Sequence, residues 1–185
     1  MKEERMELKR IGRKTVYEGK VLDFCKDRMV LPDGAEEEWD FVHHHKGGGA
    51  AVVPVLPDGR ILMIRQMRPA VDRETLEIPA GARDAGEDPA VTAARELCEE
   101  TGYRAGRLSY LCTIDTAVAW CDEKTEIFLA EELVREGTQM LDEAEEILVE
   151  ACSARDLLAG IQNGEIRDAK TVAGICAYLS AFCQG

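Results

Sequence analysis

Short apolar segments separated by turn residues run through most of the chain and indicate a protein rich in β-strands. Near the beginning, KTVYEGKVLDFCKDRMV and EEEWDFVHHH flank the turn LPDG, which predicts two or three strands over residues 15–46. The runs AAVVPV and ILMIRQM follow, joined by a second turn, LPDGR, and lead into TLEIPAG. Further along, RLSYLCTIDTA and KTEIFLAEEL predict two more strands, and the acidic segment LDEAEE leads into ILVEAC.

One segment between these strands has helical spacing, and the residues at both of its ends favour a helix. Asp88 is a suitable N-cap, Pro89 suits the first helical position, and Gly102 is a natural stop after the last turn. Apolar side chains recur between them at helical spacing and predict one buried stripe, made of Val91, Ala94, Leu97 and Cys98.

Two more helices are predicted after ILVEAC. Ser153 opens the first of them, over ARDLLAGI, and Asp156 completes a capping box with it. The second covers roughly residues 168–183. Its buried face is expected to consist of Val172, Ile175, Cys176, Leu179 and Phe182. Strands with helices on both sides predict an α+β fold in three layers, with a mixed β-sheet sandwiched between helices.

Composition narrows the class of protein. A chain of 185 residues, 45% of them hydrophobic, is long enough for one compact domain with a real core. No apolar run approaches the length of a membrane span, and the charged start MKEERMELKR is unlike a signal peptide. Seven cysteines without CxxC pairing indicate reduced, mostly buried thiols, so we expect a cytoplasmic protein. The net charge of −13 argues against nucleic acid as a partner.

Several carboxylates crowd onto the first predicted helix. Glu96 and Glu100 lie one turn apart and share the face opposite the apolar stripe, with Glu99 beside them. Arg95 can reach Glu99 at the i+4 position and hold that carboxylate in place. Like charges so close repel one another unless cations neutralise them, and oxygen-only ligands suit Mg²⁺, or Mn²⁺ in its place. A solvated acidic helix face is the competing interpretation, because glutamate is normally exposed.

The same helix and the loop before it match a longer pattern, G-x5-E-x7-R-E-U-x-E-E-x-G-U, in which U is a bulky apolar residue. Its positions are occupied by Gly81, Glu87, Arg95, Glu96, Leu97, Glu99, Glu100, Gly102 and Tyr103. Every charged and glycine position is met. The segment resembles the Nudix box. The chain is therefore similar to the Nudix hydrolases, which cleave nucleoside diphosphates linked to some other group.

Most of the chain, from about Val16 to Phe182, resembles one branch of that family, the ADP-ribose pyrophosphatase-like enzymes. The markers are the strand-rich N-terminal region, VVPV, RQMR, LEIPAG before the box and LDEAEE after it. The resemblance implies two regions, an N-terminal strand-rich dimerisation region over residues 1–46 and a Nudix hydrolase domain over residues 47–185. It implies that the working unit is a homodimer.

The resemblance also implies Mg²⁺-dependent hydrolysis of the pyrophosphate bond in a nucleoside diphosphate sugar, a small-molecule substrate. ADP-ribose, giving AMP and ribose 5-phosphate, is expected first, with GDP-mannose or NADH as alternatives. A nucleotide-sugar-binding regulator without catalysis is the alternative from another class, although such proteins usually lose box glutamates that are present here. One departure concerns the substrate pocket. Ala117-Val118-Ala119 stands where many ADP-ribose hydrolases carry a Ser-Pro-Gly-like turn.

The ligand set that the resemblance implies lies on and just before the box. The metal ligands would be the backbone carbonyl of Ala80 and the side chains of Glu96, Glu99 and Glu100. Gly81, Glu87 and Arg95 would brace the geometry of the loop and helix around them. For Glu87, a first-turn charge that suits the helix dipole is an alternative.

The general base is expected on the acidic segment after the box, as in related dimeric enzymes. Glu145 is the first candidate and Glu143 the second, while Glu99 and Arg95 complete the catalytic set. A solvated acidic turn is the competing interpretation of this segment. In that case the base lies in the box, on Glu99.

Substrate contacts are expected from two further segments. Gln66 and Arg68 alternate along one strand, so both can face the same cleft. Arg68 matches a position that holds a phosphate or terminal ribose in similar enzymes, and an exposed strand-end arginine is the alternative. Trp39 either stacks on a nucleobase or is an ordinary core tryptophan. The run His43–His45 is not expected to bind metal, because consecutive strand residues face opposite sides.

Overall fold

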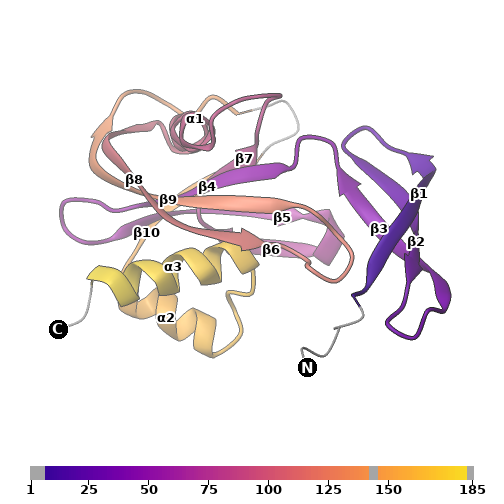
Figure 1. Ribbon diagram of the computed structural model, residues 1–185. Helices are drawn as coiled ribbons and strands as arrows, with labels where there is room; N and C mark the ends of the chain where they lie inside the picture. The colour runs from indigo at the N-terminus through magenta and orange to yellow at the C-terminus, as the bar shows by residue number, and fades with distance from the viewer. Residues whose placement is uncertain (1–6, 142–145, 183–185) are drawn as a thin grey trace. The chain divides into compact units, whose positions relative to one another are not determined.

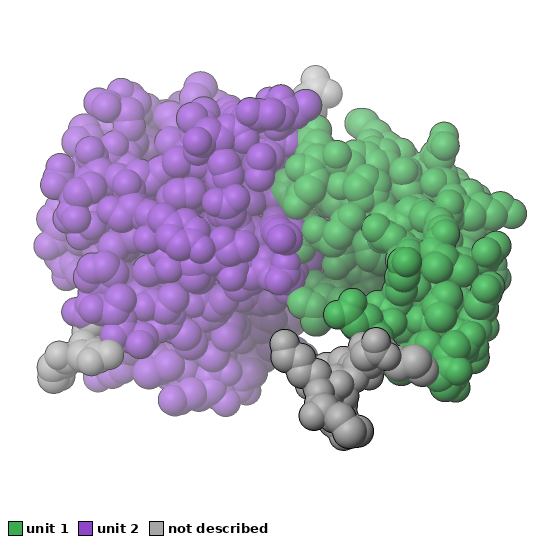
Figure 2. All heavy atoms as spheres, viewed as in Figure 1, with its two compact units in different colours: residues 1–48, 117–123 green, residues 49–116, 124–185 purple. Residues whose placement is uncertain are grey.

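The computed structural model describes residues 7–141 and 146–182. The chain divides into two compact units, residues 1–48 with 117–123 and residues 49–116 with 124–185 (Figure 2). The division falls slightly beyond the boundary expected between residues 46 and 47. It also assigns residues 117–123, far along the chain, to the first unit.

An antiparallel sheet makes up most of the first unit. Its strands β1 (Lys9–Glu18), β2 (Leu22–Val30) and β3 (Glu36–His44) lie side by side in that order (Figure 1). The turn LPDG joins β2 to β3, so the strands predicted on either side of it are confirmed. Many apolar side chains of this unit are exposed, namely Leu8, Ile11, Val16, Tyr17, Val21, Leu22, Phe24 and Trp39.

Residues 117–123 pack against β3 within the first unit. The Val42 N–H donates a hydrogen bond to the Trp120 carbonyl over 2.7 Å. The Asp122 carboxylate lies 2.7 Å from Nδ1 of His43. The first of the three consecutive histidines is therefore paired with a carboxylate of this segment.

The second unit contains two sheets, with strand orders β10–β5–β6 and β7–β4–β9–β8. Their strands are β4 (Gly48–Pro54), β5 (Ile61–Arg68), β6 (Arg73–Glu77), β7 (Ala80–Ala82), β8 (Tyr103–Asp115), β9 (Lys124–Arg135) and β10 (Ile147–Cys152). The helices are α1 (Pro89–Thr101), α2 (Ala154–Gln162) and α3 (Ala169–Phe182), and a short 3₁₀ turn, Pro69–Val71, follows β5. No helix among the described residues is long and apolar enough to cross a membrane.

The central strands are buried on both faces because each carries an unbroken apolar run. Alternate side chains of a strand point to opposite faces. Val53 therefore packs in one core with Leu157 of α2 and Ile175 of α3, while its neighbour Val52 packs in a second core with Leu97 of α1. The sheets of this unit lie between α1 on one side and α2 with α3 on the other (Figure 1). The expected α+β sandwich is confirmed.

The ends of α1 are those predicted from the sequence. The Asp88 side chain accepts a hydrogen bond from the N–H of Ala90, and Pro89 occupies the first helical position. Gly102 ends the helix at φ 74°, a left-handed conformation that glycine adopts without steric cost.

The buried stripe predicted for α1 is wrong in part, because Val91 and Ala94 are exposed. The helix instead buries Thr92, Ala93, Leu97, Glu100 and Thr101. Polar side chains occupy core positions here because they have partners. The Thr101 hydroxyl, for example, donates a hydrogen bond to the Leu97 carbonyl over 2.5 Å. Complete burial of Leu97 still contributes about 1.5–3 kcal/mol.

The predictions for the C-terminal helices and the cysteines hold only in part. The Ser153 side chain caps α2 by accepting a hydrogen bond from the Asp156 N–H, as predicted. In α3, Ile175 is buried, but Cys176 and Phe182 are exposed because the helix covers the sheet with one face only. The described cysteines are free thiols, as expected, yet Cys25 alone among them is buried.

Candidate active site

The segment that matches the Nudix box borders a cavity of about 480 Å³ in the second unit. The cavity is lined by Ala80, Gly81, Ala82, Asp84, Arg95, Glu96, Glu99, Glu100 and Met140. β7 contributes backbone to this lining and α1 contributes carboxylates. All four residues predicted as metal ligands therefore line the same cavity.

Glu100 joins α1 to β7. The N–H of Ala80 donates a hydrogen bond to Oε2 of Glu100 over 2.9 Å, and the glutamate is only 4% exposed. The expectation that Glu100 lies on the helix face away from the core is therefore wrong. A backbone donor provides the partner that a buried carboxylate requires.

Arg95 bridges the carboxylates of this segment. Its Nη1 donates to Glu96 over 2.6 Å and to Glu99 over 2.9 Å, and its Nη2 donates to Glu87 over 3.4 Å and to the Ala82 carbonyl over 3.2 Å. Burial acts to lower the pKa of the guanidinium, but the surrounding carboxylates raise it above its ordinary value. The predicted contact between Arg95 and Glu99 is confirmed, and Arg95 offsets part of the crowded negative charge.

Glu87 closes the loop onto the start of α1. Its carboxylate accepts hydrogen bonds from the Asp84 N–H over 3.1 Å and from the Thr92 hydroxyl over 2.7 Å. These two donors and Arg95 lower the pKa of Glu87 to about 2. Glu87 is thus an anion with fixed partners, which is the geometry that a bracing role requires.

Gly81 leaves room for the carboxylate of Glu96. A Cβ added at Gly81 would lie 2.1 Å from the carboxyl carbon of Glu96, closer than any real Cβ contact. A larger residue at position 81 therefore requires Glu96 to move. Glycine at position 81 therefore allows the Glu96 carboxylate to lie directly against β7.

The donor set suits a hard divalent cation, because three carboxylates and a backbone carbonyl offer only oxygen atoms. Within residues 7–141 and 146–182, however, no three His, Cys, Asp or Glu side chains are arranged to hold a metal ion. In this arrangement Arg95 binds Glu96 and Glu99 at the same time. Arg95 contacts one oxygen of each carboxylate, so a cation in the cavity would share Glu96 and Glu99 with Arg95.

Residues just before the acidic segment hold the C-terminal turn of α1, and sequence reasoning missed them. The Glu99 carbonyl accepts a hydrogen bond from the Met140 N–H over 2.8 Å. The Gln139 side-chain amide donates to the carbonyls of Glu100 over 2.7 Å and Ile147 over 3.0 Å. The last carbonyls of a helix lack partners within it, so these bonds satisfy them and tie α1 to β10.

The expected general bases follow Met140 in the chain. Glu143 and Glu145 lie outside the described residues. Their roles therefore remain predictions.

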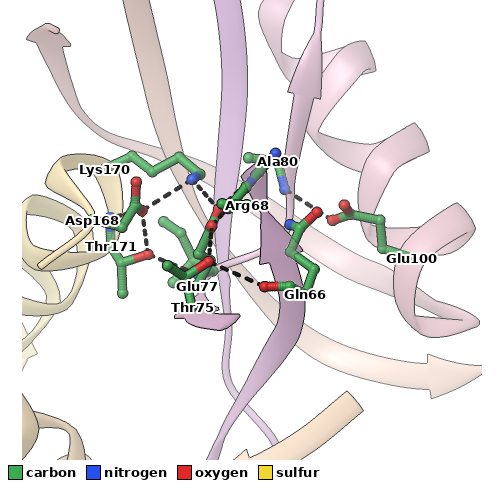
Figure 3. Close-up of polar contacts among 10 residues, drawn as sticks. Gln66, Arg68, Thr75, Glu77, Ala80, Glu100, Asp168, Lys170 and Thr171 are labelled. Carbon is green, nitrogen blue, oxygen red and sulfur yellow. Dashed lines mark hydrogen bonds and ion pairs between the residues drawn. The ribbon is translucent and has the colours of Figure 1, made fainter. Parts of the chain in front are cut away.

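A cluster of polar side chains lies where β5, β6 and the start of α3 meet (Figure 3). Glu77 is 2% exposed and accepts two hydrogen bonds from Arg68, from Nε and Nη2, each 2.7 Å long. It also accepts hydrogen bonds from the Thr75 hydroxyl over 2.6 Å and from Nζ of Lys170. Burial raises the pKa of Glu77, but these donors outweigh it and lower the pKa to about 2. The buried carboxylate is therefore ionised at neutral pH.

The start of α3 also binds the backbone that leads to the cavity. The Ile78 N–H donates to the Thr171 hydroxyl over 2.9 Å, and that hydroxyl donates to Asp168 over 2.6 Å. Asp168 also accepts a hydrogen bond from Lys170 over 3.0 Å. The short segment from Glu77 to Ala80 is thus fixed from α3 at one end and from α1 at the other.

Sequence reasoning found Arg68 in this cluster and missed its partners. Glu77 lies in LEIPAG, which served only as a family marker, and Lys170 comes from a helix 93 residues further on. The charged start of α3 was the one available signal for Lys170. A lysine in the first turn of an otherwise apolar helix needs a counter-charge if that turn is buried.

Gln66 and Arg68 share one face of β5, but neither is among the described residues that line the 480 Å³ cavity. Nε2 of Gln66 is buried, and it has no hydrogen-bond partner among the described residues. Its side chain extends from β5 toward Ala80 and Glu100 (Figure 3). A buried donor without a partner is unfavourable, so Gln66 remains a candidate for contact with a bound molecule.

Trp39 belongs to the first unit and is 40% exposed, with its indole N–H donating to Glu37 over 3.0 Å. It is therefore not the core tryptophan that was its alternative interpretation. The segment Ala117-Val118-Ala119, which replaces the proline turn, lies in the same unit, and Val118 within it and Trp120 just after it are exposed.

Comparison with known proteins agrees with the box and with the fold. The family model of the NUDIX domain matches residues 45–173. The ADP-ribose pyrophosphatase of Bacillus subtilis (strain 168) is 39% identical over 180 residues, 97% of this chain and 94% of that protein. A methanol dehydrogenase activator of Bacillus methanolicus is 33% identical over 170 residues, 91% of each chain. A crystal structure of an ADP compounds hydrolase has a TM-score of 0.81 at 19% identity and covers 94% of this chain and 95% of its own. The chain therefore belongs to the Nudix family, and the protein is a Nudix pyrophosphatase.

Proposed function

We propose that this pyrophosphatase hydrolyses ADP-ribose to AMP and ribose 5-phosphate with Mg²⁺ as its metal ion. The donor set around one cavity, the Ala80 carbonyl with Glu96, Glu99 and Glu100, carries the proposal. The relative from Bacillus subtilis, named an ADP-ribose pyrophosphatase, supports the substrate. Nudix hydrolases generally use divalent metal ions, and oxygen-only donors favour Mg²⁺, with Mn²⁺ as a substitute.

In this proposal some residues hold the carboxylates and the pyrophosphate in place, and another accepts a proton from the attacking water. The bound metal supplies charge neutralisation and a more acidic water. Arg95 keeps Glu96 and Glu99 in place, and Glu145 accepts a proton from the water that attacks phosphorus. Arg68 binds the pyrophosphate through Nη1, for which the described residues offer no partner.

A substrate panel with product identification tests the proposal. ADP-ribose, GDP-mannose, NADH and ATP are each incubated with Mg²⁺ or with EDTA, and the products are identified by mass spectrometry. We expect the highest kcat/KM for ADP-ribose, and no turnover in EDTA. A higher value for another compound would overturn the substrate but keep the reaction. Absence of Mg²⁺-dependent products with all four would favour a nucleotide-sugar-binding regulator.

The proposed role of Glu145 as the general base is tested by removing the charge of its side chain. If Glu145 accepts the proton, Glu145→Gln should lower kcat strongly, on the order of a hundredfold as for other general bases. The KM and the Mg²⁺ concentration required for half-maximal rate should change little.

Glu143→Gln is the matched control on the same segment, and it should lower kcat much less. Small, equal effects of both substitutions would place the base in the box, on Glu99. LDEAEE would then be a solvated turn.

We also infer that the working unit is a homodimer formed through the first unit. A small sheet with many exposed apolar side chains is only marginally stable alone and favours association. The full-length protein should sediment as a dimer at micromolar concentration. Deletion of residues 1–46 should give a monomeric or aggregated core with a raised KM, because Trp39 is lost as a stacking partner. A full-length monomer with full activity would contradict this arrangement.

A further inference from the structure

Glu77 is a buried anion that the fold has to neutralise. Arg68 and Lys170 bring two positive charges to it, and Asp168 adds a second negative charge beside Lys170 (Figure 3). Two cations and two carboxylates balance, so the cluster as a whole is neutral. Neutrality matters here because an uncompensated buried charge is strongly unfavourable.

The two cations of this cluster differ in exposure. The side chain of Lys170 is 15% exposed, whereas that of Arg68 is 41% exposed. The ammonium group of Lys170 donates hydrogen bonds to both Glu77 and Asp168. Arg68 uses Nε and Nη2 for Glu77, so Nη1 is the nitrogen that these two hydrogen bonds leave for another acceptor.

The charge of Lys170 determines how far Arg68 is committed to Glu77. Without that charge the cluster carries one net negative charge, and Arg68 becomes the sole ionic partner of a buried carboxylate. Arg68 then shares its charge with an incoming anion at a higher electrostatic cost, since the local dielectric is low.

We propose that Lys170 is a positioning residue for substrate binding: it neutralises Glu77 from the α3 side and so leaves Arg68 able to bind the pyrophosphate. The inference rests on the proposed substrate-binding role of Arg68. Asp168 orients Lys170, and Thr171 fixes the first turn of α3 to the backbone of Ile78.

A double-mutant cycle on the full-length enzyme tests this inference. KM and kcat for ADP-ribose are measured for Lys170→Met, Arg68→Ala and the double variant. Lys170→Met should raise KM about tenfold, the scale of a weakened hydrogen bond to a charged group, with a smaller change in kcat. In the Arg68→Ala background, Lys170→Met should change KM by less than about twofold, the usual limit of additivity.

Two single substitutions serve as controls. Lys170→Arg retains the charge and should keep KM within about twofold of the original, the usual limit of additivity. Lys124→Met removes a lysine of β9 whose side chain is 63% exposed, and this substitution should leave KM unchanged. A general loss of positive charge therefore cannot imitate the expected result.

The outcomes separate this inference from the proposed function. If Arg68→Ala raises KM but Lys170→Met does not, or if the two effects multiply, the role of Lys170 is overturned while Arg68 keeps its own. If Arg68→Ala leaves KM unchanged, the role of Arg68 falls and this inference with it. If Lys170→Met does not fold, Glu77→Gln combined with Lys170→Met restores the charge balance. That variant should fold with a KM near the original, and a KM as high as that of Arg68→Ala would overturn the inference.

Discussion

Glu100→Gln is expected to lower kcat by roughly a hundredfold or more, the scale on which loss of one charge-stabilising group acts on turnover. Glu100 lines the cavity and is bound to the backbone of Ala80, so its charge is placed where a metal ion would be held. The glutamine amide oxygen can still accept the Ala80 N–H. The fold should therefore remain, and the melting temperature in EDTA should hold or rise because one buried negative charge is removed.

Steady-state kinetics over a Mg²⁺ titration and thermal melts in EDTA are the measurements. Glu136→Gln is the control, because it removes a carboxylate that is paired with Arg104 on an exposed part of the same unit. Near-normal Mg²⁺-dependent turnover of Glu100→Gln would refute the assignment of the cavity as the metal site. A variant that melts far below the original would show a structural role for the charge instead.

Gly81→Ala is expected to weaken metal binding strongly, although the substitution adds only a single methyl group. The new Cβ would overlap the Glu96 carboxylate, which has to swing away because the backbone of β7 is held by its neighbours in the sheet. Loss of one positioned carboxylate should weaken metal affinity roughly 10–100-fold, as changes around metal sites commonly do. The Mg²⁺ concentration for half-maximal rate should rise accordingly.

Gly137→Ala is the matched control, since a Cβ at Gly137 meets nothing within 4 Å. Direct titration with Mn²⁺ reports metal affinity independently of turnover. If Gly81→Ala binds Mn²⁺ as tightly as the original protein, Glu96 is not a ligand in the position described. Equal loss in both variants would point to a general effect of alanine on the loops.

Local signals in the sequence predicted the parts of the fold that depend on neighbouring residues. Asp88, Pro89 and Gly102 mark the ends of α1 because caps act over one turn of backbone. The contact between Arg95 and Glu99 follows from helix geometry alone. The residues predicted as metal ligands line one cavity because the box places them on one helix and on the residue before its loop.

Other parts of the site depend on distant residues, and no local pattern could reveal them. Lys170 meets Glu77 only after the sheet and α3 have packed together. The buried face of α1 was predicted wrongly because Glu100 accepts a hydrogen bond from the backbone N–H of Ala80 in β7. This partner makes a charged residue acceptable in the interior. Apolar periodicity alone assigned that position to solvent.

The distance in sequence between Glu77 and Lys170 has a consequence for synthesis on the ribosome. Lys170 is added 93 residues after Glu77, so about 5–20 s separate the two at usual elongation rates. Of the two described cations that pair with Glu77 in the folded protein, the nascent β5–β6 pair has only Arg68 during that interval. A solvated Glu77 is then favoured, and final packing of residues 76–81 has to wait until the α3 segment has emerged.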